Sequence, residues 1–220
     1  MTADLDVVIP TLNAARSLAR TLESLSGERV TVCDGGSRDD TTTIARQAGA
    51  IVMVTEPGRG RQLAVGAVAG TAPWLLFLHA DTALSPGWAA AAQRFMAKAT
   101  DKAGYFRLRF DSADPRARRI ERLVAWRSRA LGLPYGDQGL LIARAFYRQI
   151  GGFRPLPLME DVDLVRRIGR RNLMALDADA VTSAERYERD GWLARPIRNL
   201  SCLALYFAGL SPGVIRRLYG

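Results

Sequence analysis

The fold of this protein is decided by the stretch Trp74-Leu75-Leu76-Phe77-Leu78-His79-Ala80-Asp81-Thr82. Its first five residues are large and apolar, which predicts a strand buried on both faces, as in the middle of a parallel sheet. Shorter β-branched runs precede it at residues 5–9, 30–33 and 51–54, and helical patterns separate them at residues 14–25, 39–47 and 61–69. This alternation predicts an α/β fold with a mostly parallel, Rossmann-like sheet covered by helices on both faces.

The second half of the chain predicts a less regular order of elements. Helical patterns cover residues 88–99, 114–131, 161–171 and about 190–208, and strand patterns cover residues 105–110, 139–143 and 173–176. The chain shows neither a repeat nor a low-complexity linker. We therefore expect a single domain over residues 1–220.

The composition favours an anionic partner and a cytoplasmic protein. The 220 residues include 31 Lys and Arg against 22 Asp and Glu, a net charge of +9, and almost all of the basic residues are arginines. Arginine suits phosphate and carboxylate, so a nucleotide, a membrane surface or a nucleic acid fits this charge. The two cysteines lie in apolar runs without metal-binding spacing, as expected in a reducing compartment. The N-terminus does not resemble a signal peptide, and the longest apolar run, residues 200–210, is too short to span a bilayer.

Polar residues follow three of the predicted parallel strands at their carboxyl ends, the edge where open parallel sheets bind ligands. The first strand leads into Pro10-Thr11-Leu12-Asn13 and the second into Asp34-Gly35-Gly36-Ser37. Asn13 is a candidate N-cap of the first helix. The Asp34 carboxylate, followed by two glycines, suits contact with a base or ribose. An Asx-turn around Asp34 is an equal alternative.

The fourth strand leads into His79-Ala80-Asp81, whose two polar side chains lie on one side of an extended segment. A carboxylate at the end of a buried strand is a good ligand for a hard divalent cation, which takes the rest of its shell from waters and substrate phosphates. We therefore assign Asp81 a functional role, with a turn cap as the alternative. His79 alone is more simply a hydrogen-bonded histidine at a strand end.

Two further segments combine polar residues with a predicted helix start. Gly58-Arg59-Gly60-Arg61-Gln62 can receive phosphate, although its spacing matches neither a Walker loop nor a Rossmann fingerprint. Met159-Glu160-Asp161-Val162-Asp163 places three carboxylates at a helix start, after a stiff loop. These acids are either favoured there by the helix dipole and by arginines one turn later, or they are catalytic.

Five segments in this order resemble family 2 glycosyltransferases of the GT-A fold. They are Val8–Asn13, Cys33–Thr41, Phe77–Thr82, Gly136–Gly139, and Gly151–Phe153 with Glu160–Leu164. The resemblance covers about residues 5–210. More narrowly, Arg59–Gln62, the His-Ala-Asp triplet and Ser183–Glu188 resemble the small subgroup of radical-SAM/selenodomain-associated transferases.

The resemblance implies an inverting transfer of a sugar from a nucleotide-diphosphate sugar to an acceptor hydroxyl. It implies that Asp34 binds the base or ribose and that Asp81, at the last position of the family's DxD motif, holds Mg²⁺ or Mn²⁺. It also implies that Asp161 is the general base, with Glu160 as the alternative. The nucleotide-binding half would be about residues 1–100, and the acceptor and catalytic half about residues 101–220.

The resemblance also implies which residues surround each substrate. The donor side comprises Pro10, Thr11, Asn13, Asp34, Gly35, Gly36, Ser37, Arg59, Arg61, Gln62, His79, Ala80 and Asp81. The acceptor side comprises Asp137, Gln138, Arg186 and Tyr187. The sequence departs from the family pattern at His79, where an aspartate is common, and at Arg186-Tyr187, where an Arg-Trp pair is often seen.

Two other functions stay open from the residues. A nucleotidyltransferase uses a similar sheet and metal, but it usually has a Gly-rich phosphate loop after the first strand, where this chain has Pro10-Thr11-Leu12-Asn13-Ala14. A basic nucleic-acid-binding module would explain the six arginines of the 114–131 helix. Neither an aromatic platform nor a recognised nucleic-acid motif accompanies them, so we do not expect a nucleic acid as partner.

Apolar and basic residues recur together in two predicted helices. The apolar residues are Ile120, Leu123, Val124 and Leu131 in one helix and Leu200, Leu203 and Phe207 in the other, with arginines around them. Basic amphipathic helices can lie in an anionic membrane interface. The hypothesis is peripheral contact with the inner face of the membrane and a lipid-linked acceptor. The alternative is that both stripes belong to the core and the arginines face solvent.

Overall fold

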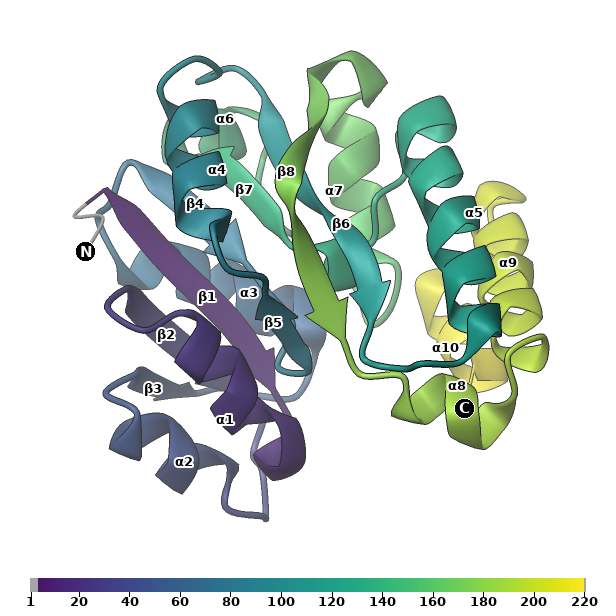
Figure 1. The fold of residues 1–220 in the computed structure, drawn as a ribbon, viewed down its shortest axis with the longest axis horizontal. Coiled ribbons are helices and arrows are strands. Elements are labelled where there is room, and N and C mark those ends of the chain that lie inside the picture. Colours follow the sequence, from purple (N-terminus) through teal and green to yellow (C-terminus); the bar gives the residue numbers. More distant parts are fainter. Residues whose placement is uncertain (1–3, 220) are drawn as a thin grey trace.

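One continuous sheet forms the centre of the computed structural model, which describes residues 4–219 (Figure 1). Its strand order is β3-β2-β1-β4-β7-β6-β8-β5. The parallel part consists of β1 (Leu5–Thr11), β2 (Arg29–Asp34), β3 (Ile51–Val54) and β4 (Trp74–Phe77). β7 (Leu140–Ala143) then runs antiparallel to β4, and β6 (Ala103–Phe110) antiparallel to β7. β8 (Leu173–Thr182) is parallel to β6, and β5 (Thr82–Leu84) is antiparallel to β8.

Helices cover both faces of this sheet. One face carries α1 (Ala15–Ser24), α2 (Thr41–Gln47) and α4 (Trp88–Met96), and the other carries α3 (Arg59–Ala69), α6 (Arg144–Gln149) and α7 (Glu160–Ile168). Successive side chains of a strand point to opposite faces. Accordingly, Val7 and Ile9 belong to the core under α1, and Val8 belongs to the core under α3.

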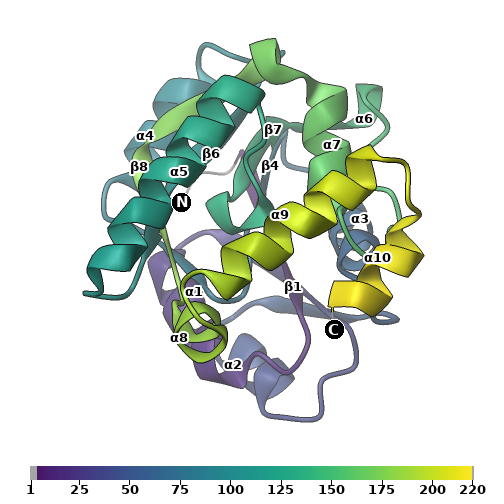
Figure 2. The same ribbon diagram turned by 90° about the vertical axis from the view of Figure 1, so that its right-hand side faces the viewer.

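The remaining helices lie beyond the β6–β8 side of the sheet. They are α5 (Pro115–Leu131), α8 (Glu185–Asp190), α9 (Ala194–Phe207) and α10 (Pro212–Tyr219), and Figure 2 views the molecule from their side. Two short 3-10 helices, η1 (Gly136–Gln138) and η2 (Arg170–Asn172), precede β7 and β8. Across the described residues 4–219, we find no helix with both the length and the apolar character needed to cross a membrane.

The α/β fold with helices on both faces is confirmed, and the sheet is more mixed than its N-terminal half suggested. Its parallel pairings are β1–β2, β1–β4, β2–β3 and β6–β8, and the other three are antiparallel. The short β5, α6 and α10 were not predicted. The helix expected at about residues 190–208 is α9, which begins at Ala194. The short α8, which was not predicted, ends at Asp190 before Gly191, whose φ is 95°. β8 continues to Thr182, six residues beyond its predicted end.

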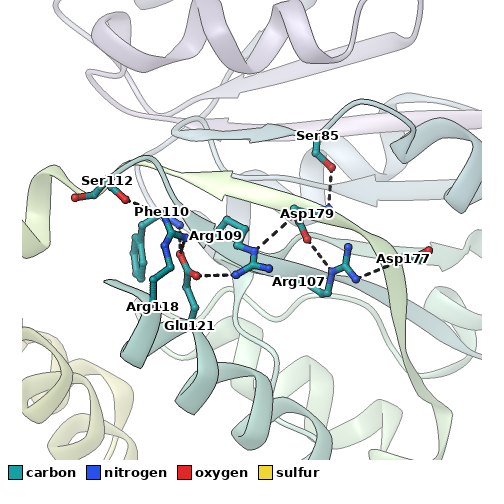
Figure 3. Close-up of polar contacts among 9 residues, drawn as sticks. All are labelled: Ser85, Arg107, Arg109, Phe110, Ser112, Arg118, Glu121, Asp177 and Asp179. Carbon is teal, nitrogen blue, oxygen red and sulfur yellow. Dashed lines mark hydrogen bonds and ion pairs between the residues drawn. The ribbon is translucent and has the colours of Figure 1, made fainter. Parts of the chain in front are cut away.

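Two ion-pair networks hold distant elements together. Asp6 of β1 is buried and accepts bonds from Arg29, from the Ala72 backbone N–H and from the buried Arg144 guanidinium at 2.5 Å. On the other side of the sheet, Glu121 of α5 accepts from Arg109 of β6 and from Arg118 (Figure 3). Asp179 of β8 pairs with both Arg107 and Arg109, so this network joins α5, β6 and β8.

Candidate active site

Two connected hollows lie at the carboxyl ends of the parallel strands. The larger, which we name the groove, has a volume of about 760 Å³, and its lining includes the predicted donor residues Pro10, Thr11, Asn13, Arg59, Gln62, His79, Ala80 and Asp81. The smaller, the inner pocket, has a volume of about 140 Å³, and its lining includes Asp81, Asp137, Asp161, Arg186 and Tyr187. Both hollows are lined by Arg59, His79, Asp81, Ser183 and Arg186, so they meet at these residues.

Asp81 lies where the groove and the inner pocket meet. It follows β4, and its backbone carbonyl accepts from the Ser183 N–H at 3.0 Å, which fixes it beside the end of β8. The carboxylate has a long contact of 3.4 Å with the Thr82 hydroxyl. Its oxygens therefore face the hollows and can bind a ligand.

A divalent cation fits the donor atoms at this junction. No group of three or more His, Cys, Asp or Glu side chains that could hold a metal occurs among the described residues. A single carboxylate still suits Mg²⁺ or Mn²⁺, since such hard cations keep waters and take oxygens from substrate phosphates. The buried Oδ1 of Asp137, which also lines the inner pocket, has no hydrogen-bond partner among residues 4–219, so a second oxygen is left unsatisfied nearby.

His79 is a neutral group at this junction. Burial, followed by the positive charge of Arg59, lowers its pKa to about 4, against the opposing charges of Asp81 and Asp161. Its ring lies against the backbone of η1, because a Cβ added to Gly136 would come within 2.4 Å of Nε2. His79 therefore shapes the wall of the site and adds no positive charge at pH 7.

The two candidate bases, Glu160 and Asp161, lie at the start of α7 and have different surroundings. Met159 adopts a left-handed conformation with φ 65°, and it is followed directly by Glu160 and Asp161. The Asp161 carboxylate lines the inner pocket and accepts from the Gly136 N–H at 2.9 Å and the Val162 N–H at 2.8 Å. Both bonds hold it in one orientation.

Glu160 points elsewhere. It is 1% exposed and forms an ion pair with Arg59, while its Oε2 has no partner among the described residues. Burial raises the pKa of Glu160, and Arg59 opposes that rise. Its side chain lines neither the groove nor the inner pocket, and instead borders a small apolar cavity behind them.

The Asp34 carboxylate is engaged by its own turn. It accepts from the Thr11 hydroxyl at 2.9 Å, from the Gly36 and Ser37 N–H groups at 2.9 and 2.7 Å, and from the Ser37 hydroxyl at 2.5 Å. Burial alone would raise the pKa of Asp34, but these bonds lower it below its usual value. The side chain is 1% exposed, so the Asx-turn describes its contacts. Asp34, Gly35, Gly36 and Ser37 line neither hollow, and a donor contact by this segment stays a prediction.

The predicted donor residues at the start of α3 differ in whether they face the hollows or hold the helix in place. Arg59 lines both hollows, whereas Arg61 forms an ion pair with Glu56 and lines neither. Gln62 borders the groove, but its Nε2 donates to the carbonyls of Thr11 and Cys33, both at 2.7 Å. Gln62 thus fastens α3 to the ends of β1 and β2.

Asn13 is not the N-cap of the first helix, contrary to the prediction from the sequence. It has a left-handed backbone with φ 50°, and Ala14 occupies the N-cap position instead. The Asn13 side-chain oxygen accepts from the Arg38 N–H at 2.9 Å, and its own N–H donates to the Ser37 hydroxyl at 2.8 Å. Asn13 therefore joins the loops after β1 and β2, beside the groove.

The acid and the amide of η1, Asp137 and Gln138, have different surroundings. The pKa of Asp137 is raised to about 6, chiefly by burial and further by Asp161 and Asp81, while Arg127 opposes the rise. Gln138 does not line either hollow and is 1% exposed. It accepts from the Ser128 hydroxyl at 2.9 Å and donates to the Phe106 carbonyl at 3.1 Å. Gln138 therefore holds η1 against α5 and β6, and an acceptor contact by its side chain stays a prediction.

The acceptor-side pair at the start of α8 lies in the inner pocket. Arg186 is exposed, lines both hollows and is in no ion pair with the described residues. The Tyr187 ring packs on Phe110 at 4.7 Å and on Trp192 at 5.4 Å between ring centres. This pocket is also lined by four residues that were not predicted from the sequence: Phe110, Tyr135, Arg195 and Asn199. Those of α9 could not be identified from the sequence, because α9 lies near these strand ends only in the folded chain.

Relatives of this chain have been found by sequence. A family model described as "Glycosyl transferase family 2" matches residues 6–154. An uncharacterized glycosyltransferase of Mycobacterium tuberculosis is 39% identical over 83 residues, which is 37% of this chain and 38% of the relative. A Mycobacterium bovis protein matches with the same figures. The match thus spans about two fifths of the length of these curated relatives. The narrower radical-SAM-associated subgroup stays a prediction.

Solved structures share the fold. The mannosyltransferase PcManGT from Pyrobaculum calidifontis, in complex with GDP-Man and Mn²⁺, has a TM-score of 0.67 at 17% identity, over 98% of this chain and 68% of that one. TarS of S. aureus in complex with UDP has a TM-score of 0.63 at 17% identity, over 96% and 68%. Both are glycosyltransferase structures of the GT-A fold. Since the family model covers more than half of the residues, this protein belongs to glycosyl transferase family 2.

Proposed function

We propose that the protein transfers a sugar from a nucleoside-diphosphate sugar to an acceptor hydroxyl, with inversion at the anomeric carbon. The observation that carries this proposal is the junction at Asp81. A groove large enough for a sugar nucleotide meets there an inner pocket that contains a second, fixed carboxylate, Asp161. The structural relatives bound to GDP-Man with Mn²⁺, or to UDP, support this class of donor.

The groove supplies groups for the donor. Its lining at the start of α3 offers Arg59 and the helix N-terminus, both of which favour phosphate. Asp81 is the residue that would hold Mg²⁺ or Mn²⁺. Such a cation, when bound, neutralises the charge that develops on a leaving diphosphate. Arg186, which lines both hollows, adds a positive charge at the same junction.

Asp161 is the proposed general base. Its carboxylate is held by two backbone N–H groups and faces the inner pocket, where an acceptor hydroxyl would lie. The acceptor oxygen gives its proton to Asp161 as it attacks the anomeric carbon, and the diphosphate leaves on the opposite face. Proton transfer of this kind typically contributes about 10²–10⁴-fold to the rate. Glu160 is the weaker candidate because its side chain is committed to Arg59.

The inner pocket favours an acceptor with an apolar part. Phe110, Tyr135 and Tyr187 provide aromatic walls, and Arg195 and Asn199 of α9 provide polar groups. This combination supports a lipid-linked acceptor whose polar end enters the pocket. The cytoplasmic location expected from the sequence is part of the same proposal.

A thermal-shift panel of UDP-, GDP- and dTDP-sugars, with and without Mn²⁺, tests the proposal. A donor at 100 times its Kd stabilises the folded state by ~2.7 kcal/mol, which raises the Tm of a chain of this size by roughly 5–10 °C. We expect one nucleotide to do so only when the metal is present. A protein that responds to no sugar nucleotide would not be this transferase. Salt-sensitive binding to nucleic acid without any metal would favour the nucleic-acid-binding alternative.

A further inference from the structure

Helix α9 has apolar side chains on both of its faces. On the inner face, Cys202 and Leu203 are buried in a core that α7 shares. On the outer face, an exposed stripe consists of Leu193, Ile197, Leu200 and Phe207, at 78%, 62%, 50% and 50% exposure. The outer face of a helix that only covers a core is normally polar. Arg166 of α7 lies over the Phe207 ring at 5.0 Å, but each side chain of the stripe keeps at least half of its surface exposed and can meet a partner.

Exposed apolar side chains also occur on α10 and α5. Val214 and Leu218 of α10 are 46% and 62% exposed, and Leu123 and Trp126 of α5 are 50% and 58% exposed. Figure 2 shows α5, α9 and α10 together on the side of the molecule that faces the viewer. We name the outer surface of these three helices the C-terminal face. It is a large exposed apolar area of the kind that marks an interaction site.

The charge of the C-terminal face selects an anionic partner. Residues 191–220 contain four arginines and neither Asp nor Glu. Arg195 and Arg198 pair with Asp190 of α8, whereas Arg216 and Arg217 of α10 are exposed and form no ion pair with the described residues. On α5, Arg119, Arg122 and Arg129 are exposed and form no ion pair with described residues. Two other exposed arginines of this region, Arg109 and Arg118, are instead paired with Glu121 (Figure 3). A second copy of the chain would bring arginines against arginines, which disfavours a dimer through this face.

The same helix that carries the stripe also forms a wall of the inner pocket. Arg195 and Asn199 line that pocket, while Ile197 and Leu200 point outward. A surface lying against α9 would therefore be within one helix diameter of the pocket, about 10 Å.

We propose that the C-terminal face docks on an anionic lipid bilayer, with the stripe of α9 inserted at the level of the headgroups and the arginines of α5 and α10 against them. Basic helices with an exposed apolar stripe bind interfaces in this way. Docking presents the inner pocket to acceptors anchored in the same bilayer. This last step rests on the proposed glycosyl transfer, whereas docking itself does not.

Vesicle co-sedimentation of the full chain tests docking without any donor. We expect binding to phosphatidylcholine vesicles that contain about a third phosphatidylglycerol, no binding to pure phosphatidylcholine, and loss of binding at high salt. The double variant Ile197→Ser/Leu200→Ser should lower partitioning by more than roughly tenfold, since two apolar side chains no longer insert. The matched control, Val54→Ser/Val68→Ser, changes valines that are 69% and 74% exposed on β3 and α3 and should bind like the parent.

The arginines are tested separately. Arg119→Gln/Arg217→Gln should lower partitioning about fivefold per arginine, the equivalent of ~1 kcal/mol each. The control Arg46→Gln/Arg94→Gln removes two exposed arginines of α2 and α4 and should have little effect.

Three results would overturn the proposal. The first is no sedimentation with the anionic vesicles at low salt. The second is unchanged binding by Ile197→Ser/Leu200→Ser, which would place the contact elsewhere. The third is a dimer in light scattering that the same variant converts to monomer, which would assign the stripe to a second copy. None of these results changes the donor-dependent Tm shift, so failure of docking is distinguishable from failure of the proposed function.

Discussion

Replacing Asp161 by Asn removes the proposed base and changes little else. The carboxylate now accepts two backbone bonds, at 2.9 Å from Gly136 and 2.8 Å from Val162. The amide oxygen of Asn can keep one of them, while its NH₂ group faces the other N–H and loses that bond. A lost hydrogen bond costs ~1 kcal/mol, which lowers the Tm of a chain of this size by roughly 2–4 °C.

The increase in the activation barrier should be much larger than the loss in the free energy of unfolding. Without a general base, kcat should fall about 10²–10⁴-fold, equivalent to ~3–5 kcal/mol in the barrier. Donor affinity should stay unchanged, because Asp161 faces the inner pocket and does not line the groove. The assay is release of nucleoside diphosphate from the donor found by thermal shift, together with the Tm of the variant and its donor-induced shift.

Glu160→Gln is the matched control for this experiment. It removes the neighbouring carboxylate and weakens the ion pair with Arg59, so we expect lower stability with a smaller fall in kcat. A role of Asp161 as the general base is refuted if Asp161→Asn keeps kcat within a few-fold of the parent while its Tm falls. In that case the carboxylate only caps α7. A larger kcat loss for Glu160→Gln would make Glu160 the base.

Three other variants test the metal site, a buried acid and a buried ion pair. Asp81→Asn should abolish the metal-dependent Tm shift by the donor, and His79→Ala should weaken it less because the imidazole is neutral at pH 7. Asp137→Asn should raise the free energy of unfolding by up to ~3 kcal/mol at about pH 7.5 and not at about pH 4, in urea melts at both. Folding raises the pKa of Asp137 from 3.8 to about 6. As the pH rises through this range, ionisation of Asp137 therefore lowers the free energy of unfolding of the parent, and Asn avoids this loss. Arg144→Met should lower the free energy of unfolding by ~3–5 kcal/mol. It removes one of the two guanidinium partners of the buried Asp6 and also the donor to the buried carbonyls of Ala67 and Ala72. Denaturant melts measure the change, and a loss under ~1 kcal/mol would contradict it.

The N-terminal half of the fold could be predicted because its signals are local. The strands around Trp74–Phe77 are continuous apolar runs, and the helices between them repeat apolar residues at helical spacing. The second half was harder, because its pairings depend on contacts far apart in the chain. β5 has only three residues and is stabilised by pairing with β8 about 100 residues later. A short segment of this kind carries no periodic pattern of its own.

Side-chain orientation in the site could not be predicted from residue type. Asp34 and Asp81 both end apolar strands, yet four donors from the Asp34 turn and Thr11 occupy the first carboxylate, while the second faces the hollows. A glycine pair after Asp34 permits that turn. The resemblance placed Gln138 on the acceptor side, whereas in the structure its amide bonds to α5 and β6.

The contrast between Glu160 and Asp161 shows why neighbouring acids need a tertiary structure to be ranked. In a helix, successive side chains point about 100° apart, so the two carboxylates take different directions. Which of them faces the pocket depends on the direction in which α7 begins, and the left-handed Met159 sets that direction. Arg59, a hundred residues earlier, then engages Glu160 and leaves Asp161 to the η1 backbone. A substitution that disfavours the left-handed Met159 conformation, Met159→Val, should therefore keep both acids but lower kcat. The expected loss comes from poorer orientation of Asp161, and it should be visible as a fall in kcat at unchanged donor affinity.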